Sequence, residues 1–283
     1  MAKASSSAST LSDVPDSDEE KNHRMERLHN LLKSHETYAG NTGVSDTVQW
    51  VSTTYGKKLV LKNETNKEEA DPVMLSTVVK INSCFMDIGL FKPNEFNKEL
   101  KDARLNAVGI IPGVTLFDEE FIVARTNLEN IMKGVDTKME NSPLKDRTSD
   151  TCIKFRHKVF KDRVEDLSDE EVESVRERWN PRSKEAVEMW PETIQRYQAQ
   201  EIQAYDKNGD LLKPSQYNAT FHGAVVRVNF NVNYWRKGRT TTIDIVAMRV
   251  LSAAPPPVAL KTPEKKDPFD VDLPPPRKKT KRA

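Results

Sequence analysis

Glycine and cysteine are both scarce in this chain of 283 residues, which has ten glycines and two cysteines. Phosphate-binding loops are usually rich in glycine, so the low glycine content argues against them. The patterns GxxxxGK[S/T], GxGxxG, HExxH and GxSxG are all absent. Cys84 and Cys152 each stand apart from any second cysteine or histidine pair, which argues against a disulfide framework and a zinc site. We therefore expect a protein of a reducing compartment that is not an enzyme and uses no metal or cofactor.

Long apolar runs are missing as well. No stretch of about 18 apolar residues occurs, and the N-terminus is rich in serine and then in acid, unlike a signal peptide. These absences predict an intracellular protein that has no membrane partner.

Charge is nearly balanced in total but segregated along the chain. The formal net charge is +1, yet acids and serines dominate residues 1–20, whereas prolines and cations dominate residues 252–283. Segments of this composition bury too little apolar surface to fold, so we expect two disordered tails. In the first tail Ser12 and Ser17 precede acids and could accept phosphate, or the tail could simply keep the chain in solution. Between the tails we expect a helix and linker over residues 21–46 and one folded domain over residues 47–251.

The C-terminal tail contains two basic clusters separated by ten residues, which is the spacing of a bipartite nuclear-localisation signal. Its cations are Lys265, Lys266, Arg277, Lys278, Lys279, Lys281 and Arg282. An extended backbone with spaced cations can lie in an acidic groove of a nuclear import receptor, and it can equally bind phosphates without sequence preference. The tail predicts a protein that acts in the nucleus.

Apolar residues at helical spacing predict several helices. The predicted helices cover residues 19–38, 93–105, 117–133 and 168–179. The third should bury Phe121, Ala124, Leu128 and Ile131. Its first turn carries Asp118, Glu119 and Glu120, which suit the helix dipole but would also be the starting point for a metal-dependent nuclease. We favour the helix-start interpretation, since acids at that position are common.

Strand patterns fill most of the remaining domain. Residues 47–55 and 57–62 predict a hairpin, and the long apolar segment 72–91 predicts a central strand. Trp190 and Pro191 should close a short turn. Residues 193–205 fit either a strand or a helix, and the DKNGD turn that follows favours a strand.

Residues 153–163 read IKFRHKVFKDR, in which cations alternate with apolar side chains. As a strand, this segment would place Lys154, Arg156 and Lys158 on one face, where they could track phosphates, with Phe155 in the core. The alternative is an edge strand whose lysines discourage aggregation.

Residues 217–251 predict a long hairpin. From Val226 to Trp235 the side chains alternate: valines, Phe230 and Tyr234 point to one side, and Arg227 and asparagines point to the other. Residues 236–239 form a basic turn in which Gly238 can take positive φ. The exposed face would carry an aromatic ring, amides and cations, a combination that suits a nucleic-acid strand.

Several features of this region resemble the C-terminal half of phage-type single-stranded-DNA-binding OB-fold proteins. They are the segment DKNGDLL (206–212), Phe221 followed by Gly223, and a long alternating strand that turns back into TTTIDIVAMRVL. The resemblance spans roughly residues 193–251. It implies strands that close a small barrel, with aromatic and basic side chains holding the unpaired strand. That family usually ends in an acidic tail with an aromatic tip, whereas this chain ends in a basic block.

These observations predict an α+β fold, mainly β: an OB-like small barrel or strongly bent antiparallel sheet with peripheral helices. The predicted function is binding of single-stranded nucleic acid, above all DNA, with little sequence preference, and the resemblance implies a role in replication or recombination. The binding residues we expect are Lys154, Arg156, Lys158, Arg227, Asn229, Trp235, Arg236, Lys237 and Arg239. The alternative is a viral or nuclear structural protein whose β domain assembles with itself. Homo-oligomers are compatible with both interpretations.

Overall fold

The computed structural model describes residues 18–95, 97–146, 151–164 and 168–254. Both predicted tails, with Ser12, Ser17 and the seven cations of the localisation signal, lie outside these residues. The helices are α1 (Asp18–Lys33), α2 (Val44–Thr47), α3 (Thr115–Lys133), α4 (Asp169–Trp179), α5 (Lys184–Arg196) and α6 (Tyr217–Phe221). The strands are β1 (Val48–Ser52), β2 (Gly56–Leu61), β3 (Leu75–Phe85), β4 (Arg104–Ile110), β5 (Ile153–Lys158), β6 (Phe160–Asp162), β7 (Tyr197–Ala199), β8 (Gln203–Tyr205), β9 (Val225–Trp235) and β10 (Thr240–Ser252).

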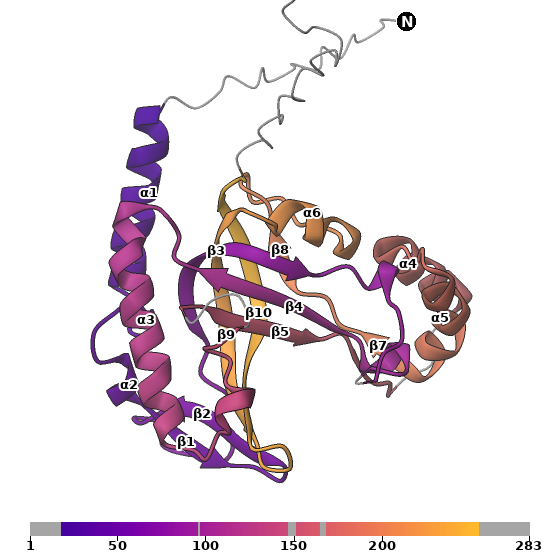
Figure 1. The fold of residues 1–283 in the computed structure, drawn as a ribbon, viewed down its shortest axis with the longest axis horizontal. Coiled ribbons are helices and arrows are strands. Elements are labelled where there is room, and N and C mark those ends of the chain that lie inside the picture. Colours follow the sequence, from indigo (N-terminus) through magenta and orange to yellow (C-terminus); the bar gives the residue numbers. More distant parts are fainter. Residues whose placement is uncertain (1–17, 96, 147–150, 165–167, 255–283) are drawn as a thin grey trace, which may run out of the picture.

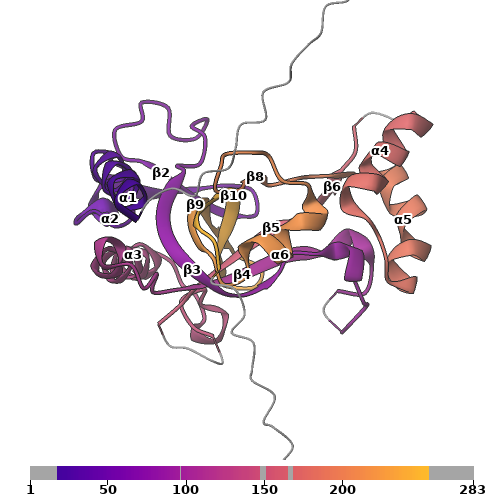
Figure 2. The ribbon, with the colours of Figure 1, turned by 90° about the horizontal axis from the view of Figure 1, so that it is seen from above.

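Eight of the strands form one sheet in the order β1-β2-β9-β3-β4-β5-β10-β8. Because β9 also pairs with β10, five strands (β9, β3, β4, β5 and β10) close into a ring. The long β3 bends strongly around this ring (Figure 2). The predicted α+β class with a mainly β, strongly bent sheet is confirmed at this level.

The prediction that the sheet is antiparallel throughout was wrong, because β10 pairs in parallel with β5 and with β8. Parallel neighbours need a long crossover connection, and the segment that carries α4 and α5 provides one.

The interior of the ring is filled by the inward side of the alternating strands. Along β9 the side chains of Val226, Val228, Phe230, Val232 and Tyr234 are buried, as predicted. Phe155 of β5 is also buried, and its ring meets that of Phe230 edge to face at 5.7 Å between centroids. The outward residues of β9 therefore face away from a closely packed core.

Two groups of helices lie on opposite sides of the sheet (Figure 1). On one side α1 and α3 run next to each other, and a second apolar cluster joins them to the sheet: Leu32, Tyr38, Val78, Phe117 and Val225. The predicted burial of Phe121, Ala124, Leu128 and Ile131 along α3 is confirmed.

On the other side lie α4 and α5. The capping box of Ser168 and Glu171 opens α4 as predicted. The prediction of a turn at Trp190 and Pro191 was wrong, because both residues lie inside α5. The buried face of α5, which includes Trp190 packed against Phe160, compensates for the backbone hydrogen bond that a proline removes.

Three further predictions of local structure were wrong. The described part of residues 93–105 contains no α-helix; after a short 3-10 turn (Leu100–Asp102) the chain enters β4 at Arg104. Here pairing with both neighbouring strands outweighs helix propensity. Residues 193–205 contain the end of α5 followed by β7 and β8, rather than one strand. In the turn after β9 it is Arg239, with φ 47°, and not Gly238 that takes positive φ.

Candidate functional site

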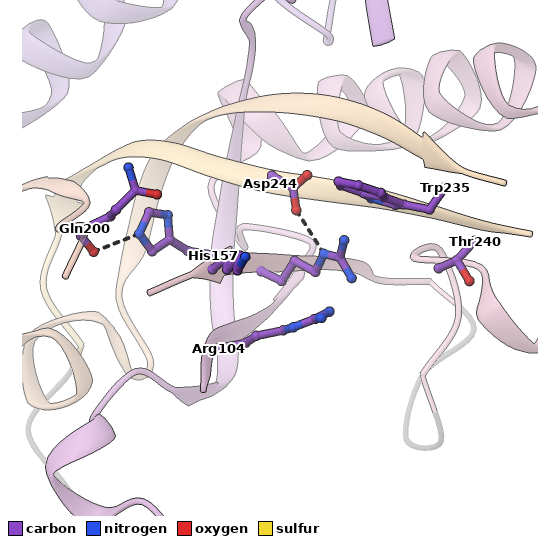
Figure 3. Close-up of a pocket in the computed structure, with 8 residues that line it drawn as sticks. Arg104, His157, Gln200, Trp235, Thr240 and Asp244 are labelled. Atoms are coloured by element: carbon purple, nitrogen blue, oxygen red, sulfur yellow. Dashed lines mark hydrogen bonds and ion pairs between the residues drawn. The ribbon is translucent and has the colours of Figure 1, made fainter. Parts of the chain in front are cut away.

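A groove with a volume of about 530 Å³ lies on the outward face of the ring. It is lined by Arg104, Arg156, His157, Lys158, Gln200, Trp235, Thr240 and Asp244. The strand register explains why residues so distant in sequence meet. Arg104 pairs with Lys158 across β4 and β5, and Arg156 pairs with Asp244 across β5 and β10. Residues paired across strands point to the same side of a sheet, so these four side chains share one face. Figure 3 shows two of them, Arg104 and Asp244, among the residues that line the groove.

Asp244 organises the centre of the groove. Its Oδ1 accepts a hydrogen bond from Arg156 Nε at 2.9 Å, which is also an ion pair. Its Oδ2 accepts from Asn233 Nδ2 at 2.8 Å and from Thr242 Oγ1 at 2.9 Å. Both carboxylate oxygens are therefore occupied, and the single acidic side chain among the lining residues is already paired.

Trp235 is held by the same network. Its Nε1 donates to Thr242 Oγ1 at 3.0 Å, and Thr242 in turn donates to Asp244. The anchored ring remains 42 % exposed, whereas most aromatic side chains of the chain are buried. The neighbouring Gly56 allows β2 to approach this end of β9, because a Cβ there would overlap the carbonyl oxygen of Tyr234. The result is an oriented, partly exposed tryptophan that lines the groove.

The groove carries more positive than negative charge. Three cations, Arg104, Arg156 and Lys158, stand against the one carboxylate of Asp244. Desolvation of the Arg104 guanidinium, followed by the charge of Arg156, lowers the pKa of Arg104 from its ordinary value. An anionic group entering the groove would relieve this crowding of cations.

His157 closes the end of the groove where β10 leaves β5 for β8. Its Nδ1 lies 3.2 Å from the carbonyl oxygen of Ile245, and its Nε2 lies 3.0 Å from that of Gln200 (Figure 3). The imidazole thus links β10 at Ile245, beside a register shift between β10 and β9, to Gln200 in the segment before β8. We assign His157 a structural role in shaping the groove.

The structure brings three of the predicted binding residues into this groove: Arg156, Lys158 and Trp235. Lys154 shares their outward face, opposite Val108 of β4, and is half-buried. Arg236 and Lys237 are exposed at the hairpin tip beside Trp235. Arg239 forms an ion pair with Asp136, which raises the pKa of its guanidinium.

Arg227 and Asn229 lie apart from the groove, at the other end of β9. Eight residues separate Arg227 from Trp235, roughly 27 Å along a strand. There they line a second hollow of about 290 Å³ with Gln203, Tyr205, Gly209, Ala247, Met248 and Arg249. Burial, and then the like charge of Arg249 on the paired position of β10, lower the pKa of Arg227. The structure thus divides the predicted site into two.

Sequence reasoning missed Arg104, Thr242 and Asp244. The helix predicted over residues 93–105 includes Arg104, and a helix there would not place this residue opposite Lys158, as the strand does. Thr242 and Asp244 could have been predicted. Together with Thr240 they alternate along the return strand, and because Thr240 pairs with Trp235, all three lie on the same face as Trp235.

The acidic run at the start of α3 has partners that account for it. Glu120 is buried and accepts a hydrogen bond from the Tyr38 hydroxyl at 2.6 Å, with His29 at 2.8 Å and Lys33 at 3.2 Å. Asp118 accepts from the backbone N–H of Val114 at 3.0 Å. Across the described residues, no group of three or more His, Cys, Asp or Glu side chains is placed to hold a metal ion. Nor does any helix in this part of the chain have the length and apolarity needed to cross a membrane.

No protein-family model matches the chain, and no curated protein matches it. Among solved structures, the fold has a weak neighbour in gp2.5, a single-stranded DNA binding protein encoded by bacteriophage T7. The identity is 11 %, the TM-score is 0.34, and the match covers 64 % of this chain and 93 % of that chain. A likeness of this size leaves the family of the chain undetermined.

Proposed function

We propose that the groove between Trp235 and Arg104 binds single-stranded nucleic acid. One observation carries the proposal: a half-exposed tryptophan, oriented through Thr242, borders three cations whose only acidic neighbour in the groove is already paired. Bases stack on aromatic rings irrespective of sequence, and phosphates bind the cations. This combination favours an unpaired strand, since a base inside a duplex cannot offer its face to a tryptophan.

The wider proposal is a non-enzymatic protein that coats exposed DNA during replication or recombination in the nucleus. The groove offers an aromatic ring and cations, whose contacts with bases and phosphates do not depend on sequence, and this supports the first part. The basic clusters between Lys265 and Arg282 support nuclear import. A fluorescent fusion of the full chain should accumulate in nuclei, and a fusion that lacks residues 252–283 should not; equal distribution of the two would contradict nuclear import through this tail.

Titration of the full-length protein with fluorescently labelled unpaired and paired oligonucleotides tests the binding proposal. We expect tight binding of the unpaired strand only. The slope of log affinity against log salt should be near −1.4, since Arg104 and Lys158 each contribute about −0.7 and Arg156 is already paired with Asp244. Trp235→Ala should cost about 1–3 kcal/mol of binding free energy, whereas Trp235→Phe, which keeps a stacking ring, should cost much less.

Three results would contradict the proposal. They are equal affinity for duplex and single strand, affinity that does not change with salt, and identical binding by the native protein and Trp235→Ala. The anisotropy of the labelled oligonucleotide gives the affinity of each variant directly.

A further inference from the structure

Phe85 is an exception among the phenylalanines of this protein. It is the last residue of β3 and is 50 % exposed, whereas the other phenylalanines in the described part of the chain are buried. An exposed phenylalanine loses the free energy that burial would provide, roughly 1.5–3 kcal/mol. Because exposure of this ring gives up that stabilisation, we looked for a functional role for Phe85.

The register of the ring places Phe85 in line with the groove. Phe85 pairs with Asn106 of β4, Asn106 pairs with Arg156 of β5, and Arg156 pairs with Asp244 of β10. These four residues form one row across four strands and point to the same outward side. Phe85 thus lies at one end of this row, and Asp244, which holds Trp235 through Thr242, lies at the other.

A hollow of about 220 Å³ borders Phe85, and Arg104 lines both this hollow and the groove. The described residues around it are Phe85, Phe91, Lys92, Asn94, Asn97, Ala103, Arg104 and Asn106, with no carboxylate among them. Cations and amides therefore line the surface from the groove to Phe85, and the carboxylate of Asp102 acts on Arg104 from outside this lining.

We propose that Phe85 is a second base-stacking platform, so that an unpaired strand crosses β10, β5 and β4 from Trp235 to Phe85. Arg104, which lines both hollows, would hold a phosphate between the two rings. From β9 to β3 along this path there are four steps between neighbouring strands, or about 19 Å in all. The row meets β9 at Asn231, and Trp235 lies four residues farther along that strand, about 14 Å, so the two rings are roughly 23 Å apart. At about 3.4 Å per stacked nucleotide, roughly seven nucleotides are needed to reach both rings. The inference rests on the proposed function and specifies the path of the strand.

The competing path follows the hairpin β9–β10 to Arg227 and Arg249. The observations favour the path across the strands, because the apolar cluster under α1 includes Val78, the residue paired with Arg227, and leaves the Arg227 side chain half-buried. Oligothymidylates of three and ten nucleotides, with the variants Phe85→Ala, Phe85→Tyr and Arg249→Ala, distinguish the paths.

We expect Phe85→Ala to weaken binding of the ten-nucleotide strand by about 5- to 150-fold, the equivalent of losing one stacked base. The three-nucleotide strand cannot reach both rings, so Phe85→Ala should leave its affinity unchanged when Trp235 supplies the stack. Phe85→Tyr should bind the longer strand like the native protein, and Arg249→Ala should change its affinity less than threefold. Circular dichroism and urea unfolding of each variant check that the fold is intact.

Native affinity for the ten-nucleotide strand in Phe85→Ala would overturn this inference, and so would a large loss in Arg249→Ala alone. Equal losses in Phe85→Ala and Phe85→Tyr would overturn stacking as the role of the ring. If the native protein binds the unpaired strand, Trp235→Ala binds it more weakly and Phe85→Ala binds it like the native protein, the proposed function stands and only the path to Phe85 is wrong. If the native protein binds no unpaired strand, the proposed function fails with it.

Discussion

The two ends of the hairpin β9–β10 have similar outward side chains but different surroundings. At one end, Trp235 is anchored to Thr242 and faces an open groove with three cations. At the other end, Arg227 lies opposite Arg249 and beside the apolar cluster that α1 and α3 form with the sheet. The same alternating pattern in sequence therefore produces an accessible surface at one end and a partly covered one at the other.

The cations at the two ends also differ in their partners. Asp244 orients Arg156 through an ion pair and Trp235 through Thr242. In the described residues, Arg227 has only the amide oxygen of Asn229 as a hydrogen-bond partner, at 3.1 Å, and no carboxylate lines the hollow that it shares with Arg249. Density of positive charge alone does not make a binding site; access and orientation distinguish the Trp235 end.

The largest effect should come from removing the carboxylate that holds α1 against α3. Glu120→Ala would leave Tyr38, His29 and Lys33 without their shared partner. His29 and Lys33 are partly exposed, so the main cost is the buried Tyr38 hydroxyl left without an acceptor, about 1–3 kcal/mol. Urea unfolding should show a lower free energy of unfolding by that amount. Glu119→Ala, one residue away and exposed, is the matched control and should change it by less than about 0.5 kcal/mol. Equal stability of the two variants would show that Glu120 does not hold the covered end.

The pH dependence of stability at alkaline pH tests the contribution of Tyr38 to the same network. Burial, and then the hydrogen bond and charge of Glu120, raise the pKa of the Tyr38 phenol above its ordinary value. Above about pH 10 the unfolded chain loses this proton while the folded protein keeps it, so the stabilisation present below pH 10 is lost as pH rises. The native protein should lose up to about 1.4 kcal/mol per pH unit more than Tyr38→Phe between pH 10 and 11.

Unfolding curves of the native protein, Tyr38→Phe and Tyr55→Phe over this pH range provide the measurement. Tyr55 is 75 % exposed, so its variant should follow the native slope. The pKa of Tyr217 is raised by burial as well and contributes to the slope in all three proteins. Identical slopes in the native protein and Tyr38→Phe would exclude Tyr38 as a source of alkaline instability.

At the open end, Arg104→Ala should flatten the salt dependence of oligonucleotide binding. Loss of one phosphate contact should reduce the slope of log affinity against log salt by about 0.7. Arg239→Ala is the comparison, because Arg239 is paired with Asp136, and its slope should change less. If Arg239→Ala changed this slope more than Arg104→Ala, the phosphates would contact the hairpin tip and not the groove.

The smallest expected effect lies at the covered end. Like charges directly opposite each other on neighbouring strands cost about 0.2–1 kcal/mol, so Arg249→Gln should raise the free energy of unfolding by that order. Lys237→Gln, at the exposed hairpin tip, serves as the control and should be neutral. A loss of stability in Arg249→Gln would mean that Arg249 has a stabilising role at this end.

The alternation from Val226 to Trp235, the helix of residues 117–133 and the burial of Phe155 were all predictable from sequence, because each depends on local periodicity. The strand at Arg104 was not, since it depends on pairing with β3 and β5 on either side. One lining residue of the groove, Arg104, belongs to that strand. Local patterns could identify Arg156, Lys158 and Trp235 as candidates but could not place them next to Arg104.

By itself, the sequence determined which side chains of the hairpin face outward, because a strand alternates with period two whatever surrounds it. Only the tertiary structure decided which of those side chains remain accessible. Register across β4, β5 and β10 brought Arg104, Arg156 and Asp244 together, and the packing of α1 and α3 covered the sheet beside Arg227. Pairing between strands and burial under helices join residues far apart in the chain, so no local pattern can encode them.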